Sequence, residues 1–284
     1  MDSNCVGRRA AWPWRVGAAM AGAALVLGGC GSGADDETAE PSPSASSRSA
    51  AASGAASAAA SPSSSGGGTT SLTPFEADPA RVPRTKRQAE ALAEAVALEP
   101  KAWGAGFRAQ RPEASTPGTV AVLDEQCRWE RRTLPGSVLA SRSRYSELPG
   151  SAGKGEIKAT AAVTVHTTVA AADEQLATTL EEPLRCREQQ VRTDERISGL
   201  MSTGIPYGQG RNTYADDQVV EIGSYVTGDS KRQYFWFVTR LGTVTLAVSV
   251  KGAKGYSDAD LYQYASHATV AMLDRVKFEL GGKS

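Results

Sequence analysis

A long stretch near the N-terminus lacks the side chains from which a protein core is built. Between residues 31 and 71 there is no Val, Ile, Leu, Met, Phe, Tyr or Trp, and most residues are Ser, Ala, Gly, Pro or Thr. Such a segment cannot bury enough apolar surface to offset the entropy lost on ordering, so we expect it to be disordered. The folded part of the chain is therefore confined to residues 74–284, about the size of one domain.

The residues before this tract have the layout of a secretory signal peptide. Basic residues precede an apolar run over 16–27, which is shorter than the roughly 20 residues that a membrane-spanning helix needs. The run ends in Leu27-Gly28-Gly29-Cys30, a pattern that resembles a bacterial lipobox. We expect residues 1–29 to be removed and Cys30 to carry lipid such as palmitate at the extracytoplasmic face of the cell membrane. An ordinary cleaved signal and a retained anchor are the alternatives.

Residues 30–73 would then form a lipidated cysteine followed by a flexible linker. A coil of this composition and length spans roughly 35–40 Å, enough to hold a domain away from the bilayer. The whole chain balances 31 basic against 31 acidic residues, and residues 1–29 contain three arginines and one aspartate. The mature chain is therefore slightly acidic, which gives it no charge bias toward nucleic acid.

Two cysteines remain in the expected domain, Cys127 and Cys186, because Cys5 would leave with the signal peptide. In an exported, oxidising setting a single pair predicts one disulfide bond. Free or redox-active thiols and a metal site are the alternatives. A structural zinc site is disfavoured because the chain has no C-x-x-C pair and only two histidines.

Hydrophobic periodicity predicts an α+β fold, in which helices pack on an antiparallel sheet. The helices are expected over 86–98, 170–187 and 258–277, and the second should bury Leu176, Leu180 and Leu184. Strands are expected over 119–131, 136–145, 156–169, 218–227, 232–240 and 243–251. The strand over 232–240 has apolar side chains on both faces, so it should lie inside the sheet.

The sequence carries no motif that identifies an enzyme. It has no G-x-S-x-G, H-E-x-x-H, P-loop or EF-hand pattern, so we assign no catalytic residue, metal ligand or cofactor. The best candidate for a recognition surface is the glycine-rich loop over 204–214, with Tyr207, Arg211, Asn212 and Tyr214. The alternative is a connector whose tyrosines fold back on the sheet.

Several of these features together resemble actinobacterial cell-envelope lipoproteins. The folded part is more narrowly similar to the extracellular sensor domain of PknH-type transmembrane kinases and its free-standing lipoprotein relatives. The residues that carry this resemblance are Leu184-Arg185-Cys186, the segment Arg240-Leu241-Gly242-Thr243-Val244 and the helix Ala265–Val276. The resemblance implies a cleft that binds a ligand. The family typically has two disulfides, whereas this chain has cysteines for one and no kinase domain. The Cys127-Arg128-Trp129 element is also similar to another group of small actinobacterial lipoproteins.

We therefore expect a non-enzymatic lipoprotein whose domain binds a small ligand or a cell-envelope protein. Two alternatives belong to other functional classes. One is an exported hydrolase acting on cell-wall or lipid material, and the other is a lipid carrier with an apolar cavity. Clustered polar groups with perturbed pKa values would favour the enzyme, and a large apolar cavity would favour the carrier.

Overall fold

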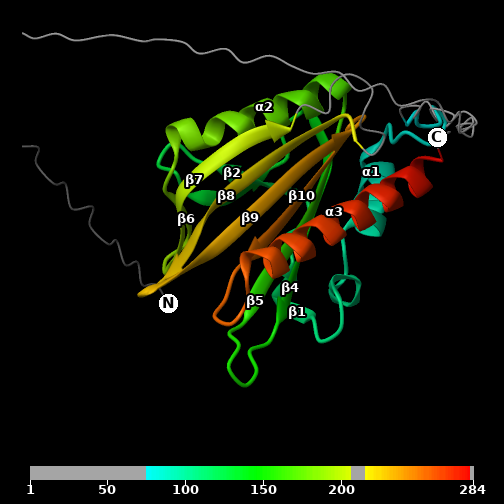
Figure 1. Ribbon diagram of the computed structural model, residues 1–284. Coiled ribbons are helices and arrows are strands. Elements are labelled where there is room, and N and C mark those ends of the chain that lie inside the picture. The colour runs from blue at the N-terminus through cyan, green and yellow to red at the C-terminus, as the bar shows by residue number, and fades with distance from the viewer. Residues whose placement is uncertain (1–74, 206–214, 282–284) are drawn as a thin grey trace, which may run out of the picture. The chain divides into compact units, whose positions relative to one another are not determined.

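The computed structural model describes residues 75–205 and 215–281, and in this part of the chain eight strands form one antiparallel sheet (Figure 1). In spatial order the strands are β1 (Arg108–Ala114), β4 (Val138–Leu148), β5 (Ile157–His166), β10 (Val244–Lys251), β9 (Ser230–Leu241), β8 (Asp217–Thr227), β7 (Glu195–Ile205) and β6 (Gln189–Arg192). A separate hairpin consists of β2 (Thr119–Leu123) and β3 (Trp129–Thr133). The helices are α1 (Lys86–Val96), α2 (Val169–Arg185) and α3 (Asp258–Leu280), with a short 3₁₀ helix at Pro100–Trp103. The predicted α+β class is confirmed.

Strand β5 shows how the sequence directs its two faces. Its odd-numbered residues from Ile157 to Val165 are buried in the main core, and its even-numbered residues from Lys158 to His166 face the other way. Because successive side chains of a strand point to opposite faces, this alternation fixes the orientation of the strand. Strand β10 pairs with β5 over its whole length and alternates in the same sense.

The main core lies between the sheet and helices α1 and α3. Leu261, Met272 and Val276 of α3 are buried against Phe235 and Leu246 of the sheet. Thr85 caps α1 in a capping box with Gln88. Ser257 caps α3, whose C-terminus ends at a left-handed glycine, Gly281.

Helix α2 and the β2–β3 hairpin lie on the opposite face of the sheet (Figure 1). Leu176 of α2 packs against Val219 and Val238, in a small cluster separate from the main core. Strand β9 therefore has apolar cover on both faces. It lies between β10 and β8, which confirms the prediction that it is an interior strand.

Three details of the sequence prediction are wrong. Residues 119–131 form two strands, because Asp124 accepts hydrogen bonds from the backbone N–H groups of Gln126 and Arg128 and closes a turn between them. Strand β5 ends at His166, and α2 already begins at Val169. Strands β1 and β6 were not anticipated, since residues 108–114 and 189–192 are largely polar and show no clear alternation. Strand β7 was also missed, because a register shift between Ser198 and Met201, at a left-handed Gly199, interrupts its alternation.

The buried stripe of α2 also differs from the expected one. Leu176 is buried, but Leu180 is 40% exposed and Leu184 is 87% exposed. The residues that face the sheet instead are Ala172, Leu176, Thr179, Glu182 and Pro183. The helix therefore places a carboxyl group, Glu182, where leucine was expected.

Candidate ligand-binding groove

The face of the sheet opposite α1 and α3 carries an open groove. Its volume is about 390 Å³, and it lies between the sheet, the β2–β3 hairpin and the end of β6. The floor is formed mainly by side chains of β4, β5, β10 and β9, and the hairpin and residues 191 and 192 form the walls. A concave site of this size suits a small organic molecule.

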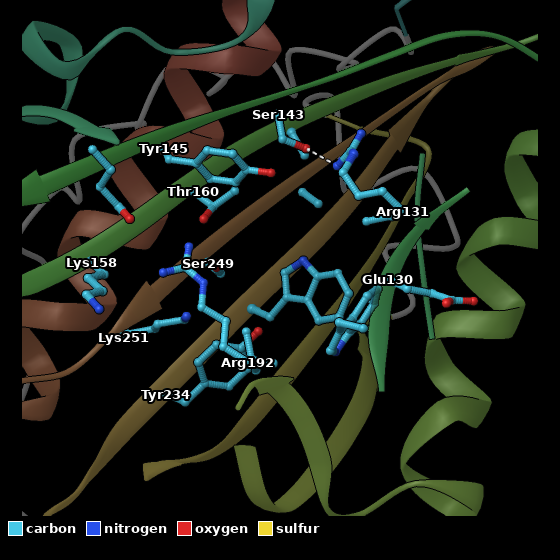
Figure 2. Close-up of a pocket in the computed structure, with 17 residues that line it drawn as sticks. Glu130, Arg131, Ser143, Tyr145, Lys158, Thr160, Arg192, Tyr234, Ser249 and Lys251 are labelled. Carbon is cyan, nitrogen blue, oxygen red and sulfur yellow. Dashed lines mark hydrogen bonds between the residues drawn. The ribbon is translucent and has the colours of Figure 1, made fainter. Parts of the chain in front are cut away.

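The floor is polar because β5 and β10 each direct one set of alternate side chains into the groove. Ser249 lies opposite Thr160, and Lys251 lies directly opposite Lys158. Figure 2 shows the two lysines side by side at one end of the groove, with Arg131 toward the other end. Two like charges directly opposite in a sheet destabilise it unless an anion lies close to both.

Glu195, the first residue of β7, supplies that anion. Its side chain is 4% exposed, and its two oxygens accept hydrogen bonds from the Nζ atoms of Lys158 and Lys251, each at 2.7 Å. Arg192 Nη1 lies 3.8 Å from the same carboxylate. Burial alone would raise the pKa of Glu195, but the hydrogen bonds from the lysines outweigh it and lower the pKa to about 2. Three cations thus surround one carboxylate.

Arg131 of β3 is a further cation of the groove and is held in place by uncharged groups. Its Nε donates to Thr119 Oγ1 at 2.7 Å, and its Nη2 donates to the Thr119 carbonyl at 2.6 Å. Its Nη1 points to Ser143 Oγ at 3.5 Å, across the floor of the groove (Figure 2). In the part of the chain that the structure describes, no carboxylate forms an ion pair with Arg131.

Aromatic side chains form the apolar part of the groove. The rings of Trp129 and Trp236 meet edge to face with their centroids 4.9 Å apart. Trp129 Nε1 donates to Gln189 Oε1 at 2.8 Å, which fixes the position of the indole. Tyr145 and Tyr234 complete this surface. Aromatic rings beside cationic groups are well suited to recognising a ligand that is partly apolar.

The hairpin is attached to the end of α2 and to β6. The predicted disulfide between Cys127 and Cys186 is present and joins the β2–β3 turn to the C-cap of α2. Arg185 Nη1 donates to the Asp124 carbonyl at 2.9 Å, and the N–H of Gln190 donates to the Cys127 carbonyl at 2.8 Å. A covalent bond and two hydrogen bonds therefore hold the hairpin wall of the groove in place.

A second hollow of about 320 Å³ lies on the other side of the hairpin and shares Trp129 and Trp236 with the groove. His166 lies in it, with its Nε2 2.8 Å from Gln175 Oε1 and 3.2 Å from Thr245 Oγ1. Burial lowers the pKa of His166 below its usual value. Together, the two hollows form openings on both sides of the hairpin.

Two buried carboxyl groups lie where α2 packs on the sheet, Glu182 of α2 and Glu221 of β8. Glu221 of β8 is fully buried, and neither of its carboxyl oxygens has a hydrogen-bond partner in the described part of the chain. Burial and the nearby Glu182 raise the pKa of Glu221 to about 9, and burial raises the pKa of Glu182 to about 7. Burial and these two carboxyls also raise the pKa of Tyr234. Glu221 therefore stays protonated at neutral pH.

The site residues predicted from the sequence divide into two groups. Cys127 and Cys186 form the expected disulfide. Tyr207, Arg211, Asn212 and Tyr214 lie outside the described residues, and so does Cys30, so their predicted roles stay predictions.

Sequence analysis did not identify the groove. Lys158 and Lys251 fall within two of the expected strands, over 156–169 and 243–251, but nothing in the sequence places the two side chains together. Only the register of β5 and β10 brings them together, and that register depends on contacts between distant segments. One signal in the sequence could have indicated the groove: polar side chains alternate along both strands, over 158–166 and 245–251.

No family model matches this chain, and no curated protein matches it either. Among the described residues, no helix combines the length and apolar character that crossing a membrane requires. The same residues contain no group of three or more His, Cys, Asp or Glu side chains placed to hold a metal ion.

Proposed function

We propose that this protein is a lipoprotein, anchored through Cys30, whose domain binds a small ligand at the extracytoplasmic face of the membrane. The observation that carries the proposal is the groove of about 390 Å³ on the sheet, with cations and aromatic rings facing one concave space. The expected disulfide is consistent with an oxidising compartment. The anchor itself is inferred from the lipobox-like sequence before the domain.

The groove holds clustered polar groups with shifted pKa values, as an enzyme would, but Glu195 is already engaged by two lysines, so we propose binding rather than turnover. The groove offers hydrogen-bond donors, aromatic surface and a carboxylate that is already engaged by two lysines. Glu195 has a strongly lowered pKa, so it is a poor proton acceptor at neutral pH. A ligand-binding, sensor-like role requires no proton transfer from any of these groups.

A variant that fills the groove tests the proposal. Thr160 lies on the floor, and Thr160→Trp places a bulky side chain there in a strand, where aromatic residues are tolerated. We expect a compound that co-purifies with the full-length protein from native membranes to be depleted at least about tenfold in this variant, as measured by mass spectrometry.

The matched control is Thr133→Trp, an exposed position at the end of β3 that does not line the groove. It should retain the compound at the wild-type level, and circular dichroism should show both variants folded. Recovery of no specific compound, or equal recovery from the two variants, would contradict ligand binding in the groove.

A further inference from the structure

The charges around the groove are unbalanced. Four cations line it: Arg131, Lys158, Arg192 and Lys251. Of the carboxylates, Glu195 is buried behind the two lysines, and Glu130 forms an ion pair with Arg132, which does not line the groove. The site therefore has an excess of positive charge directed at one concave space.

Solvent screens two of these four cations poorly, because the lysine side chains are largely buried. The side chain of Lys251 is 12% exposed and that of Lys158 is 27% exposed. Burial lowers the pKa of Lys251 below its usual value, although the hydrogen bond to Glu195 opposes this effect. An anion in the groove would compensate the remaining charge, and its attraction would be stronger here than at an open surface.

Arg131 is prepared for bidentate recognition. Two of its nitrogen atoms are held by Thr119, so the planar group is oriented before any ligand arrives. Its contact with Ser143, at 3.5 Å, is long, which leaves Nη1 available to a better acceptor. Nη1 and the second N–H of Nη2 form the edge of the guanidinium that Thr119 leaves free, and this edge matches the two oxygens of a carboxylate, sulfonate or phosphate.

The aromatic surface defines the rest of the ligand. Trp129 is held by Gln189 and packs on Trp236, so both indoles belong to a preorganised wall. Rings of this kind pack against flat, weakly polar groups. We propose that the groove recognises an organic anion in which a carboxylate, sulfonate or phosphate is attached to a planar ring system. This inference rests on the proposed function, because it specifies the ligand of the same groove.

Two dyes that differ mainly in charge test this assignment. Anilinonaphthalene sulfonate carries a sulfonate on the same aromatic framework that N-phenyl-1-naphthylamine presents without charge. The protein is the chain from residue 30 onward with Cys30→Ser, which keeps every described residue and needs no detergent. We expect the sulfonate dye to bind at least about tenfold more tightly than the neutral dye. Raising NaCl from about 0.05 to about 0.5 M should weaken binding of the sulfonate dye and leave binding of the neutral dye unchanged.

The variant Arg131→Gln should remove this preference. We expect it to weaken sulfonate binding about tenfold while changing binding of the neutral dye less than about twofold. The matched control is Arg108→Gln, since Arg108 is 65% exposed and pairs with Glu147, and neither of these two residues lines the groove. If Arg131→Gln loosens the hairpin, as a lowered melting temperature would show, Arg192→Gln provides a second test at a side chain that is 51% exposed.

The outcomes separate this inference from the proposal beneath it. Equal affinity for the two dyes, or equal losses for both in Arg131→Gln, overturns the anion preference and leaves the groove as a binding site. Failure of both dyes to bind, or binding that Thr160→Trp does not reduce, overturns the anion preference together with the groove as a ligand site.

Discussion

Glu221 occupies an environment that an ionised carboxyl group disfavours. A carboxyl group is fully buried, lacks hydrogen-bond partners among the described residues and lies near a second carboxyl, Glu182. Arg185 is the one nearby cation that lowers the pKa of Glu182, and Tyr234 adds a buried hydroxyl. Because protonation removes the charge, Glu221 is tolerated as a neutral acid, and burial favours the protonated form of Glu182 as well.

The pair makes stability depend on pH in a defined direction. Both carboxyls have pKa values in the folded state, about 7 and about 9, that lie above the unfolded value of 4.5. The folded protein therefore holds protons on this pair that the unfolded chain releases, and the contribution of the pair to the free energy of unfolding should fall as pH rises from about 4.5 to about 9. Urea denaturation at several pH values measures this slope.

The variant Glu221→Gln should flatten that slope. An amide cannot ionise, so we expect the variant to gain stability relative to the wild type at pH 9, on the order of 1–3 kcal/mol. Glu181→Gln is the control, because Glu181 is the exposed neighbour of Glu182 on α2. An identical pH slope in wild type and Glu221→Gln would show that this pair does not govern the dependence.

At the level of elements, the β2–β3 hairpin depends on its attachment to α2. The β2–β3 ladder is separate from the main sheet except for a single bridge between Arg128 and Gln190, and its turn is fixed by the Cys127–Cys186 disulfide and by hydrogen bonds from Arg185 and Gln190. A two-stranded hairpin alone is marginally stable in water. The disulfide should therefore stabilise the hairpin, which forms a wall of the groove, in addition to stabilising the whole fold.

Replacing both cysteines by alanine should lower the free energy of unfolding by about 2–5 kcal/mol. We also expect the backbone amides of β2 and β3 to exchange hydrogen faster, whereas those of β5 and β10 keep their relative order of protection. Hydrogen-exchange mass spectrometry distinguishes the two regions. Reduced wild-type protein should behave in the same way as the variant, and unchanged protection of the hairpin would contradict the attachment.

The elements also show which parts of the fold a sequence can predict. The alternation of β5 and the two-sided apolar pattern of β9 were sufficient to predict these two strands, because each pattern is a local consequence of burial. The turn after Leu123 was missed, since Cys127 adopts a left-handed conformation (φ 60°) in a segment without glycine or proline. The groove was missed because it arises from the register between β5 and β10.

At the scale of the whole molecule, the proposal joins a folded domain to a lipid. The variant Cys30→Ser should abolish incorporation of radiolabelled palmitate and move the protein from the membrane fraction to the soluble fraction. The reason is that each buried methylene of an acyl chain contributes about 0.8 kcal/mol to membrane attachment. Autoradiography of fractionated cells measures both effects.

Cys5→Ser is the matched control, because Cys5 lies in the segment that we expect to be removed. This variant should keep its label and its place in the membrane fraction. If Cys30→Ser remained labelled, or if the wild-type chain incorporated no palmitate, the lipid anchor would be refuted, and the groove would stand without it.

The position of β10 between β5 and β9 has a consequence for how the domain is made. Strand β10 begins at Val244, so during synthesis it emerges long after β5, which ends at His166. Until then one edge of β5 has no strand to pair with. Pairing two strands that are so far apart in the sequence should slow folding. Unpaired strand edges invite association between chains. The interval between these two strands is therefore the period in which the nascent protein is most exposed to aggregation.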